Sequence, residues 1–258
     1  MTPRTPAPRS RRERPAKPAL TYEGIVATAV RLMESEGLQR VTMRRLAQEL
    51  DTGPASLYVY VANTAELHAA ILEELLGAVD LSPAAGKGAA GEGEGESGSK
   101  REREGEGEGE GDKREGDWRE RLARLLGSYT HVLFAHPSLA HSALIARPSG
   151  PNYLALVEAV LALLHEGGVP DAQAAWGVDV LLQVATANAA EHSTRDRTAG
   201  AEAEHHALVA ALRDASPGTH PRIAALGGDL TSGAPEQRLA WTFRMVINGT
   251  ATTPRPAR

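Results

Sequence analysis

A tract dominated by glycine and glutamate, residues 82–116, limits what this 258-residue chain can fold into more than any other feature. Glycine loses much backbone entropy on folding, and the tract offers almost no apolar side chains to bury. We therefore expect a low-complexity linker or loop that is flexible and extended by charge repulsion. A core can form only before and after this tract, so the sequence predicts two folded parts.

Positive charge is concentrated at the start of the chain. The formal net charge is -5, yet residues 1–14 contain five arginines and one acidic residue. Prolines recur among these arginines and prevent a helix, so residues 1–19 are predicted to be a disordered basic arm. We expect folded segments at 20–81 and 117–250, and a disordered tail at 251–258.

Apolar residues recur at helical spacing in both folded segments. The first segment has four predicted helices: one beginning at Thr21 and stopped by Gly37, a short one capped by Thr42, one from Pro54 through Val61, and one capped by Asn63 with Glu66 as its reciprocal partner. The second has predicted helices from Trp118 to before Pro137, from Pro151 to Gly167, from about 172 to 192 with Asp171 as cap, at about 202–213, and from Pro235 to Asn248. A Gly/Pro/Ser-rich loop precedes the last of them. No segment alternates convincingly as a strand, so the fold is predicted to be all-α.

One segment carries a recognisable pattern. The string TMRRLAQELDTGPASLYVYVANTAEL, residues 42–67, resembles the helix-turn-helix of the TetR/AcrR family, through Thr42, Arg44, Leu46-Ala47, Pro54, Leu57-Tyr58, Tyr60, Asn63 and Glu66-Leu67. The resemblance implies a TetR-like architecture: an N-terminal helix-turn-helix domain of three or four helices, followed by an antiparallel helical bundle. It also implies a ligand-responsive transcriptional regulator that binds double-stranded operator DNA as a homodimer.

The predicted DNA contacts lie on the outer face of the two short helices. That face begins with small residues, which let the backbone approach base edges in the major groove. Thr42 is expected on a phosphate and Arg44 on a base or phosphate, and by resemblance Ser56, Val59 and Tyr60 face DNA. The predicted set is Thr42, Arg44, Arg45, Pro54, Ala55, Ser56, Tyr58, Val59, Tyr60 and Thr64.

Several of these residues have a purely structural alternative. Leu46, Leu50, Leu57 and also Tyr58 suit the core of the small domain, and Thr42 and Asn63 cap helices with or without DNA. Arg45 is either a solvated charge or a phosphate contact. Thr64 stands where family members often carry a phosphate-binding lysine, so we expect the basic arm to supply the missing charge.

Residues 117–250 resemble the family's C-terminal domain less closely, through Trp118, His136-Pro137 and the helices around 151–192. The helix after Asp171 and the last helix are apolar nearly all round, so each must be covered on two sides. We expect a four-helix dimer interface, with an ordinary interior helix of a monomer as the alternative. The predicted interface residues are Leu181, Val184, Asn188, Leu239, Phe243 and Val246.

A ligand cavity is expected between the helices of this bundle. The candidate ligand-binding residues are the polar and aromatic ones; the alternative for each aromatic residue is core packing, and the alternative for Arg147 is an exposed surface position. They are Tyr129, His131, Phe134, Arg147, Tyr153, Trp176 and Gln183.

Other classes of protein find little support. The chain has no cysteine, and we find no GxSxG, phosphate-binding loop, metal-ligand spacing or paired catalytic carboxylates. We therefore expect no enzyme activity, cofactor or bound metal. No apolar run reaches a membrane span, so we expect a cytoplasmic protein, associated with the nucleoid when bound to DNA. The predicted function is a repressor released from a palindromic operator by an unidentified small molecule; the alternative is an effector-independent regulator or activator of the same fold.

Overall fold

The computed structural model describes residues 19–85, 116–145 and 148–256, and every regular element in these ranges is helical. The elements are α1 (Tyr22–Glu36), η2 (Leu38–Arg40), α2 (Met43–Glu49), α3 (Pro54–Leu57), α4 (Thr64–Leu76), η3 (Ser82–Ala84), α5 (Trp118–Ala135), α6 (Pro137–Ala143), α7 (Pro151–Glu166), α8 (Asp171–Arg197), α9 (Ala201–Arg213), α10 (Pro221–Leu230) and α11 (Pro235–Thr252). The predicted all-α fold is confirmed.

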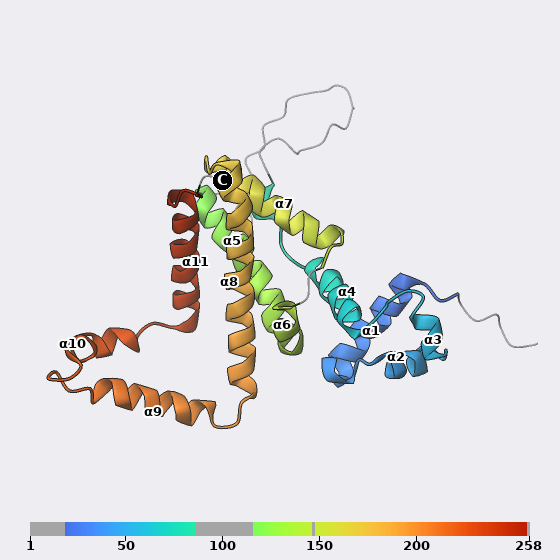
Figure 1. Cartoon of the computed structure of the whole chain (residues 1–258), viewed down its shortest axis with the longest axis horizontal. Helices are drawn as coiled ribbons and strands as arrows, with labels where there is room; N and C mark the ends of the chain where they lie inside the picture. The colour runs from blue at the N-terminus through green and yellow to red at the C-terminus, as the bar shows by residue number, and fades with distance from the viewer. Residues whose placement is uncertain (1–18, 86–115, 146–147, 257–258) are drawn as a thin grey trace, which may run out of the picture.

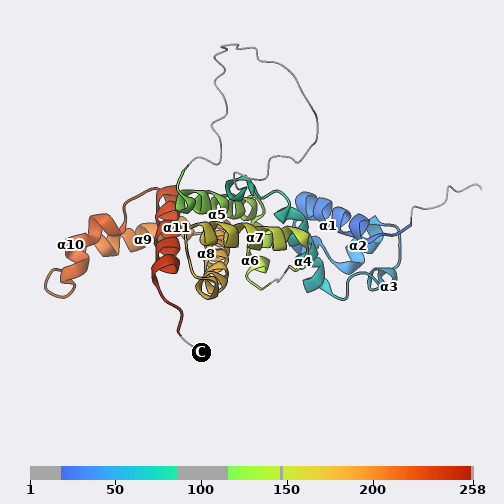
Figure 2. The same ribbon diagram turned by 90° about the horizontal axis from the view of Figure 1, so that it is seen from above.

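The helices form two groups that share one hydrophobic core. α1–α4 lie at one end of the molecule, α5–α8 and α11 form a larger bundle, and α9 and α10 project from it on the far side (Figure 1). The view from above places α3 and α10 at opposite ends (Figure 2). α4 joins the groups, because it packs on α1 and also on α6 and α7. The buried apolar side chains consequently form a single cluster from Ile25 to Ile247.

Polar caps begin three of the four N-terminal α-helices. The hydroxyls of Thr21 and Thr42 and the amide oxygen of Asn63 each accept a backbone N–H three residues later, at 2.9–3.2 Å. These bonds satisfy N–H groups that the helix itself leaves free. Glu66, the predicted partner of Asn63, accepts instead from the backbone N–H of Ala62 at 2.6 Å.

α3 is shorter than the sequence predicted. We expected a helix through Val61, but it ends at Leu57 and residues 58–60 form a turn in which the Tyr60 N–H bonds to the Leu57 carbonyl at 2.9 Å. The aromatic and β-branched residues that follow Leu57 have low helix propensity, which accounts for the early end. Before α3, Asp51 adopts a left-handed conformation with φ 48° and closes the turn after α2.

Two helices were not predicted, α6 and α10. Each begins with a proline, Pro137 in α6 and Pro221 in α10. Proline suits the first helical position, where its missing N–H costs no hydrogen bond. Pro137 was expected only to end the preceding helix, but it also begins α6. Pro221 lies in the segment expected to be a loop.

The ends of the two long C-terminal helices also differ from expectation. α8 has 27 residues and continues to Arg197, beyond the expected end near His192. The prediction that Asp171 caps it is wrong, because Asp171 is itself the first helical residue and Pro170 stands at the cap. A carboxylate in the first turn still lies favourably on the helix dipole. α11 continues to Thr252, past the expected start of the tail at 251.

The residues just before the low-complexity tract are folded. Ser82–Ala84, which we expected at the start of the linker, form η3, with Pro83 buried. The Arg121 side chain of α5 is buried; it donates to the Pro83 carbonyl at 2.8 Å and pairs with Glu166 of α7 at 2.7 Å. The basic arm, most of the predicted linker and the candidate ligand residue Arg147 lie outside the described residues.

Candidate DNA-binding surface and ligand pocket

The unit formed by α2, the turn and α3 has one buried and one exposed side. Leu46 and Leu57 are fully buried, whereas Tyr58, Val59 and Tyr60 are 54%, 79% and 37% exposed. The small residues at positions 54–56, in front of them, are exposed as well. Consecutive large apolar or aromatic side chains in water suggest a surface that another molecule covers. The small residues leave room for the close approach that base edges in a DNA groove require.

The interpretation of Tyr58 as a core residue is wrong, because half of it is exposed. Leu46 and Leu57 fill the core as expected, and Leu50 packs against its edge. The place of Tyr58 in the predicted DNA-binding set stays a prediction.

Arg45 forms ion pairs with two carboxylates. Its guanidinium lies 2.6 Å from Glu36 of α1 and 2.9 Å from Glu49 one turn along α2. The hydrogen bonds with Glu36 raise the pKa of Arg45 and lower the pKa of Glu36. Arg45 therefore ties α2 to α1. Its neighbour Arg44 is exposed and forms no ion pair with any residue that the structure describes.

The chain enters the fold beside α3. The Tyr60 hydroxyl donates a hydrogen bond to the backbone carbonyl of Leu20 at 2.8 Å. Leu20 is the first residue after the predicted arm, 1–19. The residue at which the predicted arm joins the folded domain therefore lies against the exposed side of the α2–α3 unit.

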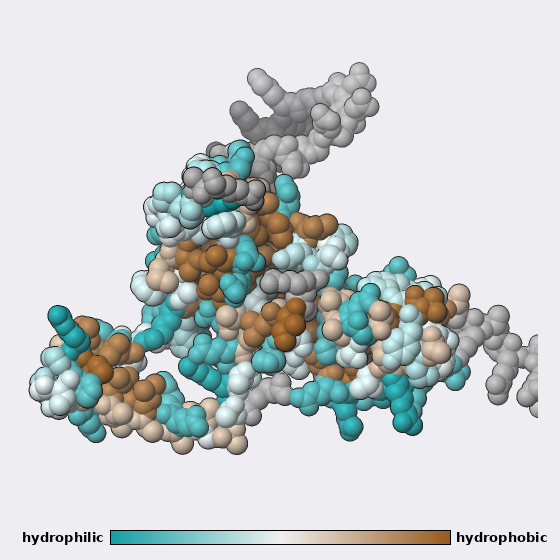
Figure 3. All heavy atoms as spheres, in the orientation of Figure 1, coloured by the Kyte–Doolittle hydropathy of each residue, from teal (hydrophilic) through white to brown (hydrophobic). Residues whose placement is uncertain are grey.

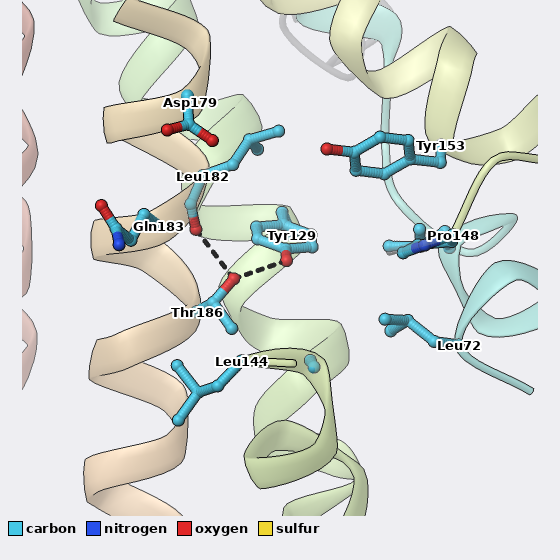
Figure 4. A pocket seen from close by; sticks show the side chains of 11 residues that line it. Leu72, Tyr129, Leu144, Pro148, Tyr153, Asp179, Leu182, Gln183 and Thr186 are labelled. Atoms are coloured by element: carbon cyan, nitrogen blue, oxygen red, sulfur yellow. Dashed lines mark hydrogen bonds between the residues drawn. The ribbon is translucent and has the colours of Figure 1, made fainter. Parts of the chain in front are cut away.

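A pocket lies between α4, α5, α6, α7 and α8 (Figure 4). The cavity has a volume of about 80 Å³ and is partly open to solvent. Its lining residues are Leu72, Leu76, Tyr129, Ala143, Leu144, Pro148, Tyr153, Asp179, Leu182, Gln183 and Thr186. Six of the eleven lining residues are apolar and five carry a polar group, and such a mixture from facing helices suits a small-molecule site.

The buried polar groups of this pocket form a chain on α5 and α8. The Thr186 hydroxyl donates to the Leu182 carbonyl at 2.8 Å, and the Tyr129 hydroxyl lies 2.7 Å from the Thr186 oxygen (Figure 4). Burial raises the pKa of Tyr129, so its phenol stays protonated at neutral pH.

α4 is joined to α7 by a carboxylate on a helix N-terminus. The Glu73 side chain accepts the backbone N–H of Asn152 at 2.6 Å and of Tyr153 at 3.3 Å, and the Asn152 amide donates to the Glu73 carbonyl at 3.0 Å. α7 has no side-chain cap of its own, because Gly150 stands at its N-cap. A Cβ on Gly150 would lie 2.5 Å from the Glu73 carboxyl group, so the glycine permits the contact.

Two regions of the chain match known protein families. Residues 25–71 match the bacterial regulatory proteins of the tetR family, and residues 110–253 match the tetracyclin repressor-like C-terminal domain. The chain belongs to the TetR family. The predicted resemblance is thereby confirmed.

Relatives of this TetR-family chain share most of its length. A solved structure of a candidate transcription regulator from Streptomyces coelicolor is 54% identical, covers 94% of this chain and 100% of its own, and has a TM-score of 0.69. The TetR family protein ActR of Streptomyces coelicolor, solved with actinorhodin, is 31% identical over 90% of this chain and 96% of its own, with a TM-score of 0.70. The HTH-type transcriptional repressor DrrR1 of Streptomyces coeruleorubidus is 25% identical, over 93% of this chain and 80% of its own.

Three of the seven candidate ligand residues of this TetR-family protein line the pocket: Tyr129, Tyr153 and Gln183. Asp179 and Thr186 on α8 also line the pocket but were not predicted to do so. Together with Leu182 and Gln183 they have the i, i+3, i+4, i+7 spacing of one helix face, which could have identified them. Leu72 and Leu76 of α4 were not predicted either, since α4 was expected only in the DNA-binding domain.

Three other candidates do not line this pocket. His131 is exposed, because it lies two residues from Tyr129 and so on the other side of α5. Phe134 packs instead on the His192 ring at 4.8 Å. Trp176 is 55% exposed and precedes the residues of α8 that line the pocket. The Arg255 guanidinium lies over its ring, 4.5 Å from the ring centroid.

The predicted dimer residues divide between two environments. Leu181 and Phe243 are buried inside the protomer, which contradicts their placement on an outer face; they pack into the core because α8 and α11 both pack on α5. Leu239 and Val246 pack at the core's edge, and Val184 and Asn188 are half-buried. The outward faces carry a different set, Trp176, Val180, Trp241 and Met245. Apolar surface is visible over α8 and α11 and along α9 and α10 (Figure 3).

Neither a metal site nor a membrane span is found within the described ranges. No cluster of three or more His, Asp or Glu side chains there could hold a metal ion. None of the helices in these ranges has both the length and the hydropathy of a membrane span.

Proposed function

We propose that this protein is a homodimeric repressor that binds a palindromic operator and is released from it by a small molecule. The observation that supports this most directly is the double role of α4. One part of α4 packs on α1 beneath the DNA-binding surface, while Leu72 and Leu76 line the pocket. A molecule in the pocket would therefore contact the helix on which that surface rests.

The exposed side of the α2–α3 unit is the proposed DNA contact. Thr42 and Arg44 approach the phosphate backbone, and Ser56, Val59 and Tyr60 lie toward the groove. We propose that the arginines of residues 1–14 contact phosphates or the minor groove, since the chain enters the fold beside Tyr60. In this proposal Arg45 acts through its ion pairs, which fix α2 on α1.

A second copy is proposed to cover the outer faces of α8 and α11. Exposed Trp176, Val180, Trp241 and Met245 give these faces an apolar character that a monomer would leave in water. α9 and α10 pack mainly on each other and expose Leu208, Leu226 and Leu230, so we assign them to the same interface. A twofold pair would present its DNA-binding units to half-sites about 34 Å apart.

Release is proposed to follow a change between α4 and α7. Leu72 and Tyr153 line the pocket, and their neighbours Glu73 and Asn152 join the two helices. A ligand that favours a wider spacing would strain this link and tilt α4, which moves the DNA-binding unit. Linkage requires that operator DNA weaken ligand binding by the same factor. The complex of ActR with actinorhodin is a precedent for a small molecule bound to a relative.

We assign DNA binding to residues 20–81 and effector binding and dimerisation to 117–250, with the low-complexity tract that follows η3 as a linker. We place the protein in the cytoplasm, on the nucleoid when bound to DNA. An effector-independent regulator or activator is the alternative. It would use the same DNA-binding surface but would have no need of a pocket beside α4.

Fluorescence anisotropy tests the proposal with an inverted repeat from the promoter next to the protein's own gene and a scrambled duplex as control. We expect a dimer to prefer the repeat. Ala143→Phe places a ring in the pocket and should weaken repeat binding, whereas Ala162→Phe on the exposed side of α7 should not. If Ala143→Phe binds like the wild type and no compound in a thermal-shift panel displaces the repeat, the effector-independent alternative holds.

A further inference from the structure

The hydrogen-bond chain in the pocket has a fixed direction. Thr186 has one hydroxyl hydrogen, and it is donated to the Leu182 carbonyl at 2.8 Å. The contact of 2.7 Å between the Thr186 and Tyr129 oxygens therefore requires Tyr129 to donate. The hydrogens of both hydroxyl groups are therefore directed toward α8. At the corner of the pocket formed by Tyr129 and Thr186, only oxygen lone pairs remain available to a ligand.

The environment keeps this arrangement in place. Thr186 is buried, and Tyr129 is 5% exposed, so bulk water does not offer either hydroxyl another acceptor. Burial also raises the pKa of Tyr129, which keeps its hydrogen in the chain at neutral pH. Asp179, further along the same face of α8, contributes a carboxylate, which accepts hydrogen bonds when ionised. Gln183 also lines the pocket, and Figure 4 shows its amide directed away from Tyr129.

The rest of the pocket combines aliphatic side chains with a second tyrosine ring. Leu72 and Pro148 form one side, opposite Leu182, and the Tyr153 ring reaches across from α7 with its hydroxyl toward α8 (Figure 4). Two tyrosine rings and aliphatic walls favour an aromatic skeleton, because such surfaces bury apolar area without hydrogen-bond demands.

We infer that the pocket selects aromatic molecules that carry a hydrogen-bond donor, such as a phenolic hydroxyl, toward the Tyr129–Thr186 corner. This inference rests on the proposed ligand response and specifies its chemistry. A ligand that brings only an acceptor to this corner, such as an ether or a ketone oxygen, meets the oxygens of Tyr129 and Thr186. Because both of these are acceptors as well, no hydrogen bond forms with them. Discrimination of this kind arises because a buried polar group left unpaired is unfavourable.

A matched pair of probes tests the inference on the full-length dimer: 2,6-dihydroxynaphthalene, which can donate, and 2,6-dimethoxynaphthalene, which cannot. Titration calorimetry should show the diol binding about fivefold more tightly, the effect of one hydrogen bond. Tyr129→Phe removes the phenol oxygen, one of the two acceptors at this corner, and should reduce this preference.

Thr186→Val gives a prediction of opposite sign. Valine has nearly the same shape as threonine but cannot accept, so the Tyr129 hydrogen becomes available to a ligand. The dimethoxy probe should then gain affinity relative to the diol. His131→Ala, which alters an exposed side chain of α5 that does not line the pocket, should leave the wild-type preference unchanged, and thermal unfolding confirms that each variant is folded.

Equal binding of the two probes to the wild type, or an unchanged preference in Tyr129→Phe, overturns the inference. If neither probe binds, the ligand class is wrong. The regulator proposal is judged separately, because Ala143→Phe tests the effect of a filled pocket on operator binding without any added compound.

Discussion

Val59 is almost fully exposed next to α3, although a valine side chain gains from burial. If it faces the major groove, Val59→Asp removes an apolar contact and brings a negative charge close to phosphates. We expect operator affinity to fall at least about tenfold, while the free energy of unfolding changes by less than about 0.5 kcal/mol. Anisotropy and urea unfolding measure the two effects.

Ala162→Asp is the matched control for this substitution, because it adds the same charge to an exposed position on α7. It should leave operator affinity unchanged at the same ionic strength. Equal losses in both variants would mean that net charge, and not the contact of Val59, determines the result.

His68 on α4 predicts a pH dependence of stability. Burial lowers its pKa in the folded state, and its Nε2 atom has no hydrogen-bond partner among the described residues. The unfolded chain therefore binds a proton more readily, and stability should fall as the pH drops through about 6.5, the ordinary pKa of histidine. Urea unfolding at pH 7.5 and 5.5 should show a smaller loss for His68→Leu. A loss as large as that of the wild type would assign the effect to other groups.

The residue types alone predicted much of the inner side of the DNA-binding domain but not its outer side. Leu46 and Leu57 are buried as their spacing indicated. Tyr58 could not be assigned in this way, because tyrosine suits a core or a contact surface and a four-residue helix gives no periodicity to choose between them. Likewise, the ion pairs of Arg45 join α1 to α2, and a sequence pattern does not include such contacts between elements.

The link between α4 and α7 can be tested by a double-mutant cycle. Glu73→Ala removes the charged acceptor from two backbone N–H groups and should lower the free energy of unfolding by about 1–2 kcal/mol. Gly150→Ala should have a similar effect, because its Cβ displaces the same carboxylate. The double variant should be hardly less stable than either single one, and the Asn152 and Tyr153 amides should exchange faster in all three.

Additive losses in this cycle would show that Gly150→Ala acts elsewhere. Gly127→Ala on α5 is the control, since a Cβ there meets nothing within 4 Å. That variant should be neutral or slightly more stable, as is usual for alanine in place of glycine within a helix.

Helix positions followed from the sequence better than helix ends and connections. α1, α4, α5 and α7 lie close to their predicted ranges, because long periodic patterns and caps mark them. α6 and α10 were missed, since each begins at a proline that also reads as a helix stop. The contact between Glu73 of α4 and the N-terminus of α7 could not be predicted from the sequence. Glu73 and Asn152 are far apart in the chain, and the group that caps α7 comes from another helix.

At the scale of the whole molecule, the net charge of -5 makes the distribution of arginines decisive for DNA binding. Removing residues 1–14 deletes five arginines and one glutamate. If four or five arginines contact phosphates, the slope of log affinity against log salt should decrease by about four units. Anisotropy between 50 and 200 mM salt, which is roughly the range over which such slopes are measured, provides the test. An unchanged slope would assign the phosphate contacts to the folded domain alone.

The faces of α8 and α11 that we propose as a dimer interface are where the sequence and the structure differ most in detail. The periodicity of α8 and α11 indicated two covered sides on each helix, but not which residues face the protomer's own core. Leu181 and Phe243 face the core. The outer faces carry the exposed side chains of Trp176, Val180, Trp241 and Met245. The sequence of a helix that is apolar all round does not show which side faces the protomer's own core. Only the packing of α8 and α11 on α5 shows this.

These outer faces make the last prediction. Trp241→Glu combined with Met245→Glu places two charges on the exposed side of α11, where Trp241 is 64% and Met245 50% exposed. Burying unpaired like charges across a twofold axis is unfavourable, so the variant should sediment as a folded monomer. Its affinity for the inverted repeat should fall at least about a hundredfold, because one unit contacts only one half-site. Leu154→Glu, at a residue 59% exposed on α7, should remain a dimer with wild-type affinity. A double variant that still sediments as a dimer would move the interface away from α11.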